Sequence, residues 1–235
     1  MKLLQIAFLG FFLTLSSFAL PTVPITFNDP TAAQDSSDVV GDPTKFDITQ
    51  LRFTAFNSAT NTFMAKVNFN YGGGVSLGSF DIGWGPLNVG DLLISNGANR
   101  YFVPLVSRTG ATLGNLYSTT SYLTAQDLAT NAGRPTSAVW GNTTGAVQIG
   151  GGTVSSVSVG GATDPNKLEV TLNFVGNAAF INNFANSTVS FASATYGNDS
   201  ITGVIPANAP VPEPSTCTTL GAGLAAVGLL RRRQA

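Results

Sequence analysis

The chain has 235 residues, a formal net charge of −1, no histidine, and a single cysteine, Cys217. Without histidine it cannot use a Ser–His–Asp triad, a histidine metal ligand or a histidine pH switch, and one cysteine cannot form an internal disulfide. Residues 21–214 carry seven basic and twelve acidic side chains, a net charge of −5, which provides no electrostatic basis for binding nucleic acid.

The first 19 residues have the pattern of a secretory signal peptide. Met1-Lys2 is a short basic start, and the apolar stretch 3–15 follows it. Ser17 and Ala19 provide the small side chains that precede a cleavage site, which predicts cleavage after Ala19. An uncleaved N-terminal membrane helix is the alternative interpretation of the same residues.

Residues 20–45 are predicted to be a flexible lead-in, because proline and small polar residues are frequent there. The segment contains four aspartates that a calcium loop could use: Asp29, Asp35, Asp38 and Asp42. Their spacing is not that of a known calcium-binding loop, so we expect a solvated segment and no metal site.

Residues 46–205 are predicted to form one domain of antiparallel strands. The clearest signals are 63–71 and 168–174, where apolar and polar residues alternate, as in strands with one buried face. The other expected strands cover 51–55, 80–84, 91–94, 101–106, 146–149, 154–159 and 189–194. Thr124 to Ala129 is expected to be a short helix, with Thr124 as the N-cap and Asp127 three residues later. Short strands separated by Gly, Asn and Ser turns predict an all-β fold, an antiparallel β-sandwich or jelly roll.

Carboxylates are the remaining candidates for catalysis, because a hydrolase without histidine can use an acid and a base of this type. The candidates are Asp81 and Asp91, which flank Trp84, and Glu169. Glu169 is expected on the polar face of a strand, and Asp91 is expected in a turn after Gly90, so neither residue requires a catalytic role to account for its presence. We therefore expect a non-enzymatic protein with no catalytic residue and no cofactor.

Four aromatic residues are candidates for binding glycans: Trp140, Tyr101, Tyr117 and Tyr122. Aromatic rings offer flat surfaces with a polar handle, on which sugars can stack. Burial in the core or in an interface is the competing interpretation. A carbohydrate-binding module for exopolysaccharide is thus the alternative function.

The C-terminal segment has three parts in order. Residues 206–215 are predicted to be a linker that includes Val211, Pro212, Glu213, Pro214 and Ser215, and its prolines prevent a helix from running through it. Residues 216–230 are uncharged and predicted to form a transmembrane helix of roughly 22 Å, shorter than the ~30 Å hydrocarbon core. Arg231, Arg232 and Arg233 then stop transfer and begin a basic cytoplasmic tail, 231–235.

This arrangement resembles the PEP-CTERM sorting signal of Gram-negative bacteria. The resemblance implies that residues 211–215 are the recognition strip and that residues 220–233 hold the protein in the inner membrane. It also implies that exosortase, a membrane-embedded transpeptidase, cuts near the strip. A tail anchor that is never cut is the alternative.

These signals together predict an exported surface or biofilm-matrix protein with a structural or adhesive β-domain. Its expected partners are exosortase, the inner membrane as a transient anchor, and exopolysaccharide. We expect a membrane-held precursor that is later found in the periplasm, at the cell surface or in the extracellular matrix.

Overall fold

The computed structural model describes residues 23–29, 42–81, 86–128, 138–161, 164, 166–195 and 198–207. Among these residues, strands predominate, every strand pair is antiparallel, and the three helices are short. None of these helices has the length and apolarity needed to cross a bilayer. The predicted signal peptide, the proline strip, the predicted transmembrane helix and Trp84 lie outside the described residues.

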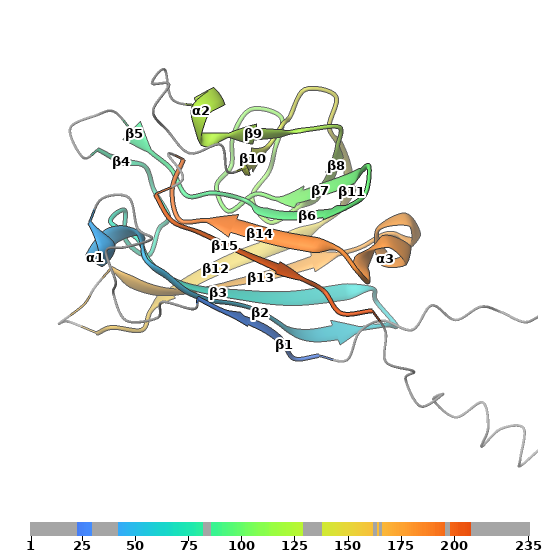
Figure 1. Cartoon of the computed structure of the whole chain (residues 1–235), viewed down its shortest axis with the longest axis horizontal. Helices are drawn as coiled ribbons and strands as arrows, with labels where there is room; N and C mark the ends of the chain where they lie inside the picture. Colours follow the sequence, from blue (N-terminus) through green and yellow to red (C-terminus); the bar gives the residue numbers. More distant parts are fainter. Residues whose placement is uncertain are drawn as a thin grey trace, which may run out of the picture.

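Two sheets face each other in a sandwich (Figure 1). The first has the spatial order β1 (Ile25–Asn28), β2 (Ile48–Asn57), β3 (Thr62–Asn70), β13 (Lys167–Val175) and β12 (Gly152–Ser158). The second has the order β11 (Val147–Gly150), β8 (Leu116–Thr119), β7 (Asn99–Val103), β6 (Leu92–Asn96), β14 (Thr188–Ala192) and β15 (Ser200–Val204). Within the second sheet, β6, β7, β8 and β11 have the same order in the chain and in space, and β14 and β15 are added beside β6.

The main core fills the space between the two sheets. The alternating residues that predicted the strands 63–71 and 168–174 supply much of it, since β3 and β13 pair directly at the centre of the first sheet. Phe63 lies opposite Phe174 in this pairing, and their rings stack with centroids 5.5 Å apart. The two strongest strand predictions are therefore confirmed as the central pair of one sheet.

Helix α3 (Ala178–Phe184) closes one end of the sandwich and was not expected from the sequence (Figure 1). The side chain of Asn177 caps it by accepting a hydrogen bond from the Phe180 N–H at 2.9 Å. Phe180 and Phe184 are buried against Phe63 with ring centroids 5.2 and 4.7 Å away. The helix is therefore fixed by its aromatic contacts with the core, because seven residues are too few for a helix to be stable alone.

A further layer covers the outer face of the second sheet. It consists of β9 (Tyr122–Thr124), α2 (Ala125–Leu128) and β10 (Ala138–Gly141), and the pair β4 (Phe80–Asp81) and β5 (Pro86–Leu87) lies nearby (Figure 1). The predicted helix start is confirmed: Thr124 Oγ1 accepts from the Asp127 N–H at 3.1 Å, and Asp127 Oδ2 accepts from the Thr124 N–H at 2.8 Å. Leu93, Phe102 and Tyr117 are buried on this outer face.

The predicted flexible lead-in, 20–45, contains part of the fold. Residues 25–28 form β1, an edge strand of the first sheet, because Ile25 and Phe27 alternate with polar residues and pack against the core. Helix α1 (Pro43–Phe46) begins at the N-cap Asp42, and Phe46 is buried. The apolar signal of β1 has only two residues, and the surrounding prolines and aspartates obscured it.

Candidate functional site

Asp91, one of the candidate carboxylates, lies in a buried ion pair beneath β10. The Arg108 guanidinium donates to both carboxylate oxygens, with Nη1–Oδ1 at 2.8 Å and Nη2–Oδ2 at 2.6 Å. The Gly141 N–H donates to Oδ2 at 2.8 Å, and the Gly141 carbonyl accepts from Arg108 at 3.1 Å. Burial raises the pKa of Asp91, while the hydrogen bonds and charge of Arg108 and the Gly141 N–H act in the opposite direction.

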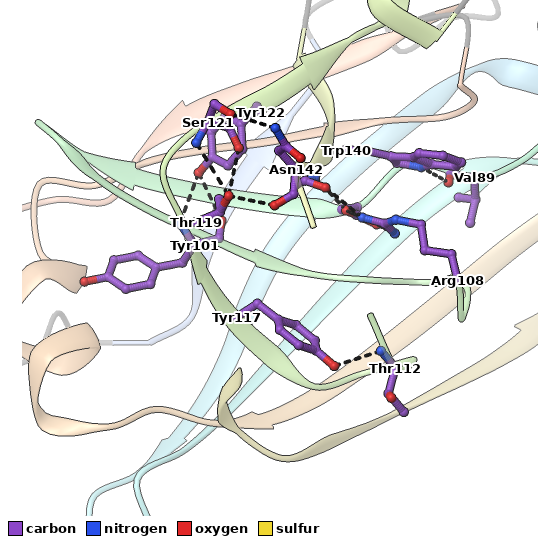
Figure 2. Close-up of polar contacts among 12 residues, drawn as sticks. Val89, Tyr101, Arg108, Thr112, Tyr117, Thr119, Ser121, Tyr122, Trp140 and Asn142 are labelled. Carbon is purple, nitrogen blue, oxygen red and sulfur yellow. Dashed lines mark hydrogen bonds and ion pairs between the residues drawn. The ribbon is translucent and has the colours of Figure 1, made fainter. Parts of the chain in front are cut away.

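Two aromatic rings flank the Arg108 guanidinium. Its central carbon lies 4.6 Å from the Trp140 ring centroid and 5.5 Å from that of Phe102. The Trp140 indole N–H donates to the Val89 carbonyl at 3.0 Å, as Figure 2 shows. These contacts hold β10 against the second sheet. The Asp91 carboxylate balances the Arg108 charge, and the rings of Trp140 and Phe102 pack against the guanidinium.

The three candidate tyrosines lie around the second sheet, but not on one face of it (Figure 2). Tyr101 points into the sandwich, where its ring meets Phe180 edge to face at 5.0 Å. Tyr117 is buried on the outer face, stacked on Phe102 at 5.1 Å, and its hydroxyl accepts from the Thr112 N–H at 2.8 Å. The Tyr122 hydroxyl lies 2.7 Å from the Ile94 carbonyl oxygen.

These positions do not give the four aromatic residues a shared exposed surface. Tyr101 and Tyr117 are each only 5% exposed. Trp140 is half-buried, and its π-system is turned to Arg108. Carbohydrate binding by this set stays a prediction.

Glu169 lies on the outer face of the first sheet, between two basic side chains. Lys66 Nζ donates to one carboxylate oxygen at 2.6 Å, and Arg52 donates to the other. The hydrogen bond from Lys66 lowers the pKa of Glu169. Glu169 and Asp91 are therefore on opposite outer faces and do not form a two-carboxylate site, while the side chain of Asp81 lies outside the described residues.

A third group of carboxylates was not predicted from the sequence. Asp29 directly follows β1, Asp47 directly precedes β2, and Asp199 directly precedes β15. All three are buried, and one carboxylate oxygen from each lies within 4.8 Å of the others. These three oxygens are close enough to bind one metal ion. Because Asp199 is far away in the sequence, no local motif could reveal the group.

Comparison with known families identifies a sorting motif in the C-terminal segment of the chain. The family model described as the PEP-CTERM protein-sorting motif matches residues 210–234. Comparison with curated proteins and with solved structures found no match. The chain therefore carries a PEP-CTERM protein-sorting motif that begins three residues beyond Ala207, the last described residue of its β-domain.

Proposed function

We propose that this chain is an exported, non-enzymatic surface or matrix protein whose C-terminal segment is cut by exosortase near residues 211–215. The observation that carries the proposal is the match of the sorting motif to residues 210–234. In this proposal, the apolar segment 216–230 and the arginines 231–233 hold the precursor in the inner membrane until it is processed.

The position of the motif relative to the fold supports processing without unfolding. Ile205 is fully buried, whereas Pro206 and Ala207 are exposed. Among the described residues, the core thus ends at Ile205, before the proline strip begins. Cleavage near Pro212 would remove no residue from the described core.

The arrangement of charged groups supports a structural or adhesive role for the β-domain. Glu169 and Asp91, the two candidate catalytic carboxylates with described side chains, are both bound by arginine or lysine. An acid or base in catalysis needs a free position beside the substrate, and these ion pairs occupy that position. The outer face of the first sheet carries the partly exposed charged side chains of Arg52, Lys66 and Glu169, which are available for polar contacts with a matrix.

Intact-mass measurement of the protein from its host tests the sorting step. We expect the wild-type protein to lack Arg231, Arg232 and Arg233 and to end near Pro212–Pro214. A strain without exosortase should retain the full C-terminus, as should a chain carrying Pro212→Ala and Pro214→Ala. A matched control, Pro206→Ala, lies outside the motif and should be processed normally. Mature wild-type protein with its arginines still attached would contradict the proposal.

Retention of the native protein on host matrix tests the adhesive role. We expect binding to the matrix without turnover of its polysaccharide. If binding follows an isolated glycan and Trp140→Ala abolishes it, the carbohydrate-binding alternative is favoured instead. Release of sugar fragments by the protein would contradict the non-enzymatic role.

A further inference from the structure

The three buried aspartates meet where the two sheets come together. Asp29 and Asp47 belong to the ends of β1 and β2 in the first sheet, and Asp199 belongs to the start of β15 in the second. A hydrogen bond already joins the two sheets here: the Ile48 N–H of β2 donates to Asp199 Oδ2 at 2.5 Å. The cluster is thus a junction between segments that are 18 to 170 positions apart in sequence.

The geometry suits a calcium ion. Calcium–oxygen distances are about 2.3–2.6 Å, so two oxygens on one ion are at most about 5 Å apart. The three carboxylate oxygens satisfy this limit, since all lie within 4.8 Å of one another.

The electrostatics favour a cation at the same place. Asp29, Asp47 and Asp199 are only 6%, 4% and 4% exposed, so water does little to screen their mutual repulsion. Burial of carboxylates is costly, and like charges at this distance repel. The N–H groups of Ile48 and Ser200 donate to the two Asp199 oxygens at 2.5 and 2.6 Å, and a divalent cation would add a full positive charge to these contacts.

A fourth oxygen provides independent support. Ser193 is fully buried, and its hydroxyl makes no hydrogen bond with any described residue. Its N–H donates to the Asp199 carbonyl at 3.0 Å, which continues the β14–β15 register of Phe191 with Ile201. Directly opposed residues in an antiparallel pair project from the same face, with Cβ atoms about 4.5–5.5 Å apart. The Ser193 hydroxyl is therefore directed to the same side as the Asp199 carboxylate, where an ion can satisfy it.

We propose that Asp29, Asp47 and Asp199, with the Ser193 hydroxyl, bind one calcium ion that clamps the two sheets together. The donor set consists of oxygen atoms alone, which hard cations prefer over zinc or copper. Calcium is favoured over magnesium because magnesium demands near-ideal octahedral geometry at short distances, whereas calcium accepts irregular sets of oxygen ligands. The proposal departs from the sequence-based expectation of no metal site, and it is independent of whether the tail is cut.

Calcium titration of the full chain in detergent, after treatment with EDTA, tests the site. We expect isothermal titration calorimetry to show one calcium ion per chain, and thermal unfolding to shift upward with calcium far more than with magnesium. Absence of both heat and a thermal shift at about 10 mM calcium, beyond the range of weak extracellular sites, would overturn the proposal.

Isosteric variants identify the ligands. Asp29→Asn and Asp47→Asn should weaken calcium binding about tenfold or more, and Ser193→Ala by a smaller factor. Asp127→Asn is the matched control: this aspartate is exposed on α2, and its loss should leave calcium affinity unchanged. If the asparagine variants bind calcium as wild type does, the assigned ligands are wrong. Near-ultraviolet circular dichroism in EDTA confirms that each variant is folded, and the wild-type titration decides the proposal if one is not.

Discussion

The outer faces of the two sheets carry the same chemistry in different surroundings. On the first sheet, Glu169 is bound by Arg52 and Lys66, whose side chains remain 31% and 27% exposed. On the second sheet, β9 and β10 cover the surface, and Asp91 is only 1% exposed in its pair with Arg108. A partly exposed ion pair contributes little to stability, as on the first sheet. The covering layer buries the pair on the second sheet, and loss of one partner there would leave an unpaired buried charge.

Breaking the covered pair should have the largest effect. Arg108→Ala leaves the Asp91 carboxylate buried without its guanidinium, and we expect a loss of about 3–5 kcal/mol in the free energy of unfolding. Urea unfolding followed by tryptophan fluorescence measures this loss. The double variant Arg108→Met/Asp91→Asn should recover part of it, since no unpaired charge then remains. A loss below about 1 kcal/mol for Arg108→Ala would place the pair with ordinary surface pairs.

Crowding the covered layer should have the next largest effect. A Cβ atom added at Gly141 would lie 2.1 Å from the Phe102 ring, which is itself stacked on Tyr117. We expect Gly141→Ala to cost about 1–3 kcal/mol, measured by the same unfolding curves. Gly151→Ala is the control, because the nearest atom to its added Cβ is 3.9 Å away. Equal effects at both positions would show that β10 does not pack tightly on the sheet.

Removing one hydroxyl of the covering layer, that of Tyr122 in β9, should have a moderate effect. Tyr122→Phe keeps the ring but loses the oxygen that lies 2.7 and 3.0 Å from the carbonyl oxygens of Ile94 and Tyr101. We expect a loss of about 0.5–1.5 kcal/mol in thermal or urea unfolding. No measurable change would mean that this hydroxyl does not hold β9 to the sheet.

Neutralising the partly exposed carboxylate of Glu169 should have the smallest effect. We expect Glu169→Gln to cost less than about 1 kcal/mol at neutral pH, and less in high salt. The hydrogen bond from Lys66 lowers the pKa of Glu169 below its ordinary 4.5, so this stabilisation is present above that value and is lost as pH falls through the lowered pKa. Wild type and variant should therefore converge in stability once the pH lies below the lowered pKa of Glu169. A difference that persists there would show that the interaction does not depend on charge.

The two sheets also differ in how well the sequence predicts them. Apolar and polar residues alternate along β3 because one face of this strand is solvated. The sequence therefore shows both that the segment is a strand and which of its side chains face the core. In β7 the consecutive residues Tyr101, Phe102 and Val103 are all buried, because both faces of the second sheet are covered. Such a strand shows no alternation, and its sequence cannot reveal which aromatic side chain faces which layer.

Sites formed by distant residues were the least predictable. The pairing of Arg108 with Asp91 depends on the turn that places Arg108 beneath Trp140, and the meeting of Asp29 with Asp199 depends on strand order. Neither can be deduced from spacing along the chain. The sorting motif, in contrast, is local and continuous, and its three parts were recognisable from the sequence alone.

The first and last strands of the sandwich lie close together, and this has a consequence for how the molecule is oriented. The Phe27 ring of β1 lies so close to Gly203 of β15 that an added Cβ there would be 2.1 Å from it. A chain tethered beyond Val204 thus has its attachment point at the end of β15, whereas Asp199 lies at the start of that strand, about 17 Å away. In a protein held by its C-terminus, the end of β15 would face the anchor, and α1 would lie at the opposite end of the sandwich (Figure 1).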